Sequence, residues 1–108
     1  MSVTPMRIFK ADFFKALSSP VRIAILDLLR NGEKSVNELT ASFEIEQVGI
    51  SQHLSVLRTK NLVKTRKVGN NVYYSILDPS VFMLLDEAAR IYQHNLIDLH
   101  QMNAPILG

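Results

Sequence analysis

One stretch of this chain is strongly basic and free of acidic residues, and its apolar pattern changes halfway along. Residues 47–75 hold five Lys or Arg and no Asp or Glu, so they carry a charge of +5 while the rest of the chain carries −3. In the first half, Ile50, Leu54 and Leu57 recur with the spacing of one helix face. In the second half, two β-prone runs flank Val-Gly-Asn-Asn at 68–71, which predicts a hairpin. The stretch therefore predicts a basic helix followed by a basic hairpin.

Length and composition restrict the class of protein. The chain has 108 residues with 47% apolar content, which fits a single domain over residues 1–108 with its own core. No apolar run approaches the roughly 20 residues needed to cross a bilayer, and the N-terminus lacks a signal-peptide core. We therefore expect a cytoplasmic protein with no membrane partner. There are no cysteines, which excludes disulfides and thiolate metal sites.

Two helices are expected before the basic stretch. Thr4 or Pro5 opens the first helix, over about 5–18. Ser19 followed by Pro20 is a strong start for the second, which we expect to run to about residue 30, where Asn-Gly stops it. The residues of the second helix expected to face the core are Val21, Ala24, Ile25 and Leu28.

The next two helices form a recognisable motif. Ser35 and Glu38 have the spacing of a capping box that starts a third helix, and after a tight turn a fourth helix begins near Gln47. Two short helices joined in this way predict a helix-turn-helix over about 35–60, whose second helix is the recognition helix. The hairpin over about 62–76 then forms a wing.

The last predicted helix is too long and too apolar for a small chain to cover. It is expected over about 79–103, roughly 25 residues or about 37 Å at 1.5 Å per residue. Together with the helix at 5–18 it leaves apolar surface exposed, which predicts a homodimer through the two terminal helices. A frayed C-terminus without a partner is the alternative. The candidate interface residues are Phe9, Phe13, Leu84, Ala88, Ile91 and Tyr92.

The recognition helix carries short, uncharged side chains opposite its apolar stripe. They are Val48, Ser51, Gln52, Ser55 and Thr59. A merely solvated face usually carries Lys and Glu, although a plain polar face remains the alternative. Gln can pair with adenine, Ser can reach a purine, and a valine methyl can meet a thymine methyl in the major groove. Gly49 would let the helix start approach a duplex. The face therefore predicts contact with double-stranded DNA.

Other polar residues around this face are further candidates for DNA contact. Arg58 stands at the end of the recognition helix and suits a phosphate. His53 lies beside the buried stripe, and a hydrogen-bonded structural role and a phosphate contact are equally open. Tyr73 is open between a phosphate or backbone contact and a plain cross-strand contact. The wing candidates are Arg66, Lys67, Asn70, Asn71 and Tyr73.

The order of elements and three motifs resemble the ArsR/SmtB family of winged helix-turn-helix repressors. The motifs are Leu-Ser-Ser-Pro-Val-Arg at 17–22, Ile-Ser-Gln-His-Leu-Ser-Val-Leu at 50–57 and Val-Tyr-Tyr at 72–74, and the resemblance covers about residues 10–100. It implies a mainly α fold with a β-hairpin wing and a homodimer that binds a partly palindromic operator. The positions it assigns to DNA reading are Gln47, Ser51, Gln52, His53 and Ser55, with the wing from Arg66 to Tyr73.

The chain departs from the family's pattern in two places. Glu46 stands where the family often has a serine cap. Many members bind a metal through cysteines, and others through histidines and carboxylates. The positions that match the second pattern are Asp78, Ser80, Ile91 and His94, of which only Asp78 and His94 can be ligands. We therefore expect no metal and no cofactor, and the sequence names no effector. The metal-binding alternative would use the last-helix residues His94, Asp98 and His100.

These patterns predict a sequence-specific DNA-binding transcriptional regulator, a repressor that acts as a homodimer. A winged-helix module that binds protein instead of DNA, and a repressor that responds to a divalent metal, are the alternatives. The chain has no glycine-rich phosphate loop, nucleophile elbow or carboxylate pair, so no enzyme is expected.

Overall fold

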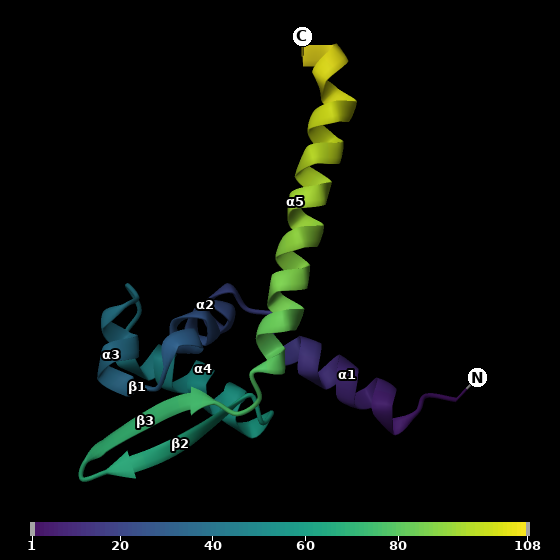
Figure 1. Cartoon of the computed structure of the whole chain (residues 1–108). Coiled ribbons are helices and arrows are strands. Elements are labelled where there is room, and N and C mark those ends of the chain that lie inside the picture. The colour runs from purple at the N-terminus through teal and green to yellow at the C-terminus, as the bar shows by residue number, and fades with distance from the viewer. Residues whose placement is uncertain (1, 108) are drawn as a thin grey trace. The chain divides into compact units, whose positions relative to one another are not determined.

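The computed structural model describes the backbone of residues 2–107 and the side chains of residues 2–97 and 99. The chain divides into two compact units, Met1–Asp78 and Pro79–Gly108, and each is described by itself. The elements of the first unit are α1 (Pro5–Ala16), α2 (Pro20–Leu28), the short 3₁₀ helix η1 (Leu29–Asn31), β1 (Lys34–Ser35), α3 (Val36–Ala41), α4 (Gln47–Thr59), β2 (Val63–Val68) and β3 (Asn71–Ile76) (Figure 1). The second unit is α5 (Ser80–Leu107).

The predicted helix starts are confirmed by their capping bonds. The Thr4 hydroxyl accepts the amide of Arg7 at 3.2 Å, and the Ser19 hydroxyl accepts that of Arg22 at 3.2 Å. In each case a proline follows at the first helical position, where its missing N–H removes no intrahelical bond. The first helix ends at Ala16, slightly before the predicted residue 18.

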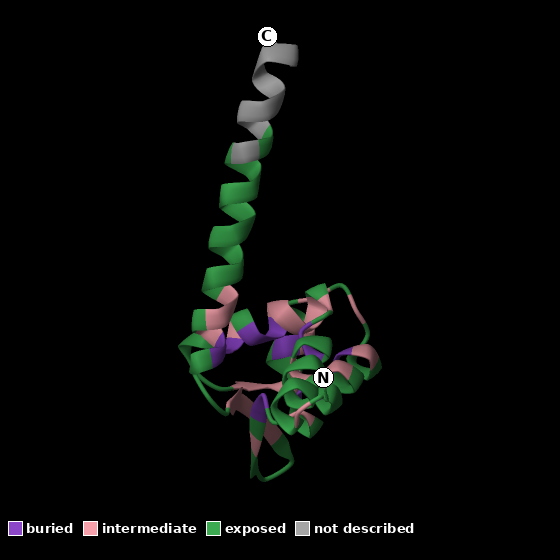
Figure 2. Ribbon diagram, turned by 90° about the vertical axis from the view of Figure 1, so that its right-hand side faces the viewer, coloured by how far each residue is buried: buried purple, intermediate pink, exposed green. Residues whose placement is uncertain are grey.

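The core of the first unit lies where α2, α3 and α4 meet (Figure 2). Its largest fully buried side chains are Ile25, Leu26, Leu39, Ile50, Leu54 and Leu57. The prediction for α2 was wrong in part, because Leu26 and Leu29 are buried whereas Val21, Ala24 and Leu28 are only half-buried. The helix packs against α4, and η1, which follows it, contacts β3, so the buried surface does not follow a single helical stripe.

The hairpin is part of a three-stranded antiparallel sheet that the sequence analysis did not predict. The strand order is β1-β3-β2, with Ser35 opposite Tyr73 and Tyr73 opposite Arg66. Because β1 has two residues, it is too short to show an alternating pattern in the sequence. This strand attaches the wing to the start of α3.

The hairpin turn is made by Gly69 and Asn70, between strands that pair Val68 with Asn71. Gly69 has a φ of 59° and Asn70 does not have a positive φ, which is the arrangement of a type II′ turn. Successive side chains of a strand point to opposite faces of the sheet. The neighbouring cations Arg66 and Lys67 of β2 therefore lie on opposite faces of the hairpin.

The end of α4 sets where the wing begins. Asn61 has a φ of 63°, its amide bonds the Arg58 carbonyl at 3.1 Å, and the Leu62 amide bonds the Leu57 carbonyl at 2.9 Å. These paired bonds, with buried Leu57 and Leu62, form a Schellman cap. The cap stops the helix and turns the chain directly into β2.

Gly49 has a packing role. A Cβ added at this position would lie 2.8 Å from Cγ2 of Ile45, in the turn that precedes α4. This contact gives the glycine a local reason, since any side chain here would push against the turn. Its role in the approach to a duplex stays a prediction.

The second unit is one helix of 28 residues, which runs past the predicted end at residue 103. Apolar side chains remain exposed along it, including Met83, Ile91, Tyr92 and Leu96. Among the described residues, no helix has the length and apolarity required to span a bilayer.

We expect Gly49→Ala to lower the free energy of unfolding. Alanine in a helix interior normally gains up to about 1 kcal/mol over glycine, but here its Cβ meets Ile45. Urea unfolding checks this, with Ile45→Ala and the double variant completing the cycle. The double variant should be more stable than the sum of the two single changes indicates; strict additivity would contradict the contact.

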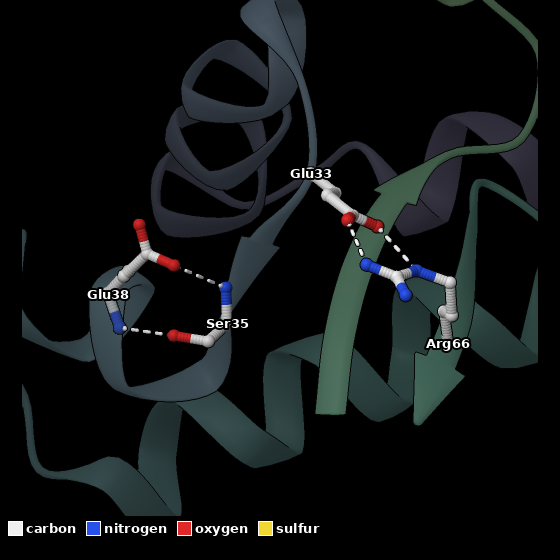
Figure 3. A network of polar contacts seen from close by, with 4 residues as sticks. All are labelled: Glu33, Ser35, Glu38 and Arg66. Atoms are coloured by element: carbon white, nitrogen blue, oxygen red, sulfur yellow. Dashed lines mark hydrogen bonds and ion pairs between the residues drawn. The ribbon is translucent and has the colours of Figure 1, made fainter. Parts of the chain in front are cut away.

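The capping box predicts an acid-sensitive contribution to stability. The Ser35 amide donates to Glu38 at 3.1 Å, and the Ser35 hydroxyl accepts the Glu38 amide at 3.1 Å (Figure 3). The bond from the Ser35 amide lowers the pKa of Glu38 below its usual 4.5. Because the folded-state pKa is lowered, this contribution is present above pH 4.5 and is lost as the pH falls through the lowered value.

In Glu38→Gln this acid-dependent part should be absent, so its stability should fall less than that of the unmodified protein on acidification below pH 4.5. Urea unfolding at neutral and acid pH measures the difference. Glu44→Gln is the control, since Glu44 makes no hydrogen bond or ion pair with any described residue. An identical acid response in Glu38→Gln and the unmodified protein would contradict the prediction.

Candidate nucleic-acid interface

Helix α4 has one fully buried side and one exposed polar side. Ile50, Leu54 and Leu57 have no exposed surface, as the spacing predicted. The residues exposed on the rest of the helix include Gln47, Val48, Ser51, Gln52, Ser55, Arg58 and Thr59. Val48 is 66% exposed at the start of the helix. The predicted reading side chains are thus exposed, with the exception of half-buried His53.

The start of α4 and the wing turn border one hollow. Its volume is about 180 Å³, and it is lined by Ser35, Val36, Asn37, Gln47, Asn70, Asn71 and Val72. The hollow thereby brings Gln47 together with the wing candidates Asn70 and Asn71, which lie more than 20 residues further along the chain. Asn37 joins them from α3, and nothing in its local sequence pattern singled it out. The amides give this surface donors and acceptors without net charge.

His53 has a structural partner. Its Nδ1 lies 3.2 Å from Nη1 of Arg22, and the ring is half-buried. Arg22 also donates through Nε to the Ala16 carbonyl at 2.6 Å and through Nη2 to the Lys15 carbonyl at 3.2 Å. His53 therefore has the hydrogen bond expected of a structural histidine, and its contact with DNA stays a prediction. Arg22 joins the C-terminal end of α1 to the recognition helix.

This contact determines the state of the neutral imidazole. A guanidinium has five N–H donors and no acceptor, so His53 Nδ1 must accept the bond. The other nitrogen, Nε2, then carries the proton and remains a donor. Sequence reasoning missed Arg22, because its partners lie six, seven and 31 residues away along the chain.

Arg66 is paired within the protein. Its Nε donates to Oε2 of Glu33 at 3.2 Å and its Nη2 donates to Oε1 of the same carboxylate, which makes the pair bidentate (Figure 3). The guanidinium carbon also lies 5.3 Å from the centre of the Tyr73 ring. The bond from Arg66 lowers the pKa of Glu33, and the same bond raises that of Arg66. Tyr73 therefore makes a cross-strand contact with Arg66, and its contact with DNA stays a prediction.

The other cations of the basic stretch differ in their surroundings. Lys60 pairs with Asp12 of α1 at 3.2 Å. Arg58, Lys64 and Lys67 are exposed and have no ion-pair partner among the residues whose side chains are described. These three are therefore the cations most available to a phosphate backbone.

The candidate dimer residues lie on both units. On α1, Phe9 is 61% exposed, and its ring stacks on that of half-buried Phe13 with centroids 6.1 Å apart. On α5, Ala88, Ile91 and Tyr92 are exposed and Leu84 is half-buried. Each helix thus presents an apolar surface.

The metal-binding alternative involves three residues of α5, and the structure describes the side chain of one of them. His94 is exposed, whereas the side chains of Asp98 and His100 lie outside the described residues. Within the described part of the chain, no three His, Asp or Glu side chains gather closely enough to hold a metal ion.

Comparison with known proteins places this architecture in a family. Residues 19–65 match the model of the bacterial regulatory proteins of the arsR family. The chain is 40% identical over 99 residues to the uncharacterized HTH-type transcriptional regulator Rv0081 of Mycobacterium tuberculosis, covering 91% of this chain and 87% of that protein. It is 40% identical over 79 residues to a transcriptional repressor SmtB homolog of Synechocystis, covering 73% and 60%.

Solved structures agree with the sequence comparison. The crystal structure of Rv0081 superposes with a TM-score of 0.79 at 39% identity, covering 89% of this chain and 97% of that one. The solution structure of Mb0332 from Mycobacterium bovis, described as a homodimeric winged helix-turn-helix DNA-binding domain, gives a TM-score of 0.75 at 28% identity, with 84% of each chain covered. The fold predicted from the sequence is therefore confirmed as a winged helix-turn-helix, and the chain belongs to the arsR family of bacterial regulatory proteins.

Proposed function

We propose that this protein is a transcriptional repressor that binds a partly palindromic DNA operator as a homodimer. The observation that carries the proposal is the exposed, uncharged face of α4. It stands on a fully buried stripe and within a stretch of the chain that has cations and no acids. Such a helix fits the major groove, where uncharged side chains distinguish base edges.

Each group of candidate residues has a role in this proposal. Gln52 and Ser55 read bases, with Val48 and Ser51 beside them on the same exposed surface. Gln47 on one side of the shared hollow, and Asn70 and Asn71 on the other, approach the sugar-phosphate backbone of the DNA. Arg58 and Lys67 bind phosphates, and His53 offers its Nε2 proton while Arg22 holds the opposite side of the ring.

A homodimer is supported by the apolar surfaces of α1 and α5 and by the homodimeric state of the Mb0332 domain. Repression is supported by the description of the Synechocystis relative as a repressor. Two-fold pairing would present two recognition helices to half-sites about one helical turn, or a multiple of it, apart. Binding to DNA also implies a cytoplasmic site of action in a bacterium.

Selection of bound duplexes from a random pool tests the proposal directly. We expect enriched sequences with two related half-sites, and affinity that falls steeply with salt because phosphate neutralisation releases counterions. A pool that stays random after repeated selection at moderate salt would overturn sequence-specific binding.

Base readers and phosphate ligands should behave differently on mutation. Gln52→Ala should lower affinity for the selected operator by about 1–3 kcal/mol and affinity for random DNA much less. Lys67→Ala should weaken both by the same factor and reduce the salt slope by about 0.9, which is the value for one phosphate contact. Titrations with both duplexes over a salt series measure this. Equal losses on the two duplexes for Gln52→Ala would contradict base reading.

The dimer proposal predicts that a charge on α5 is tolerated on one side only. Ile91→Glu places a carboxylate on the candidate interface and should shift the protein to monomer, because burying an unpaired charge is unfavourable. Gln93→Glu adds the same charge about opposite on the helix and should leave the dimer intact. Sedimentation equilibrium distinguishes the two. A monomeric unmodified protein, or a dimer unaffected by Ile91→Glu, would contradict the assignment.

A further inference from the structure

The side chain of Arg66 is engaged by a carboxylate from another part of the chain. Glu33 lies just before β1 and Arg66 lies on β2, with β3 between the two strands. Both side chains reach solvent, with exposed fractions of 38% for Glu33 and 58% for Arg66. The pair therefore forms on the surface of the wing, where DNA could reach it.

The geometry of the pair resembles that of a guanidinium bound to phosphate. Arg66 presents two parallel N–H groups to the two oxygens of Glu33, and a guanidinium binds two phosphate oxygens in the same bidentate manner. One set of donors cannot serve both anions fully. Glu33 therefore competes with any backbone phosphate for Arg66.

The Glu33–Arg66 pair is weak enough for a phosphate to compete with it. Water screens an exposed ion pair and leaves it weak, so a phosphate fixed close to Arg66 can displace the carboxylate. The Tyr73 ring lies against the guanidinium and restricts the directions in which Arg66 can swing. A duplex bound in one fixed register would hold a phosphate in the accessible direction, whereas loosely bound DNA would not hold one there.

On this basis we propose that Glu33 is a specificity-determining residue, which suppresses loose electrostatic binding to random DNA by occupying the guanidinium of Arg66. The inference rests on the proposed DNA-binding function. It also changes the role expected for Arg66, which contributes to binding on the operator and little on random DNA.

Affinity measurements on a double-mutant cycle test the inference, using Glu33→Gln, Arg66→Gln and the double variant. Each protein is titrated with the selected operator and with a random duplex across a salt series. Glu33→Gln should raise affinity for random DNA by up to about eightfold at 0.1 M salt, the effect of one added phosphate contact with a slope of 0.9. Its affinity for the operator should rise less, so the specificity ratio falls.

The Arg66→Gln background separates this mechanism from simple loss of a negative charge. If Glu33 acts through Arg66, removing its charge there should have little effect on random-DNA affinity. Glu44→Gln is the matched control, because it removes the same charge from an exposed residue without a described ion-pair partner. It should change random-DNA affinity much less than Glu33→Gln. Urea unfolding establishes that each variant is folded.

Three results would overturn the inference. Glu33→Gln could leave random-DNA affinity unchanged, raise it equally in the Arg66→Gln background, or raise operator affinity by the same factor. Failure of the underlying function is distinguishable, because the unmodified protein would then show no preference for any selected duplex.

Discussion

The burial of Ile50, Leu54 and Leu57 is the constraint on which the rest of the structure depends. All three are fully buried, so their removal from water fixes the rotation of α4 about its own axis. A rotation by one residue position would bury polar side chains and expose these apolar ones. The same rotation sets Gly49 against Ile45, His53 against Arg22 and Leu57 beneath the Schellman cap. The uncharged face of α4 is therefore directed outward by the core.

The polar contacts around α4 connect it to the elements on either side. Arg22 bonds both His53, in the middle of α4, and the last carbonyls of α1, while Lys60, just after α4, pairs with Asp12 of α1. A displacement of α1 would thus strain contacts at both points. If α1 forms part of the dimer interface, as proposed, these contacts give pairing of the subunits a direct mechanical connection to the recognition helix.

The count of five cations in residues 47–75 overstates the charge available to a partner. Glu33 and Asp12 lie outside that stretch in the sequence, yet they neutralise Arg66 and Lys60 in the folded protein. Arg58, Lys64 and Lys67 remain without an ion-pair partner among the described residues. The linear charge pattern identified a candidate surface, but folding brings acids from elsewhere and redistributes the charge on it.

The sequence by itself determined the features that depend on near neighbours. Helix caps at Thr4, Ser19 and Ser35, the apolar period of α4 and the glycine turn of the hairpin all act within a few residues, so their patterns are local. The exposed set on α4 also followed from this period.

Only the tertiary structure decided the pairs of distant residues. These pairs join positions that lie 23 to 48 residues apart in the sequence. They are the pairing of β1 with β3, the Arg22–His53 contact, the Glu33–Arg66 and Lys60–Asp12 pairs, and the hollow between Gln47 and the wing turn. No periodicity records such a pairing. It follows from how the core orients each helix and strand, which is why the sequence located the candidate surface while the fold decided which of its side chains are free.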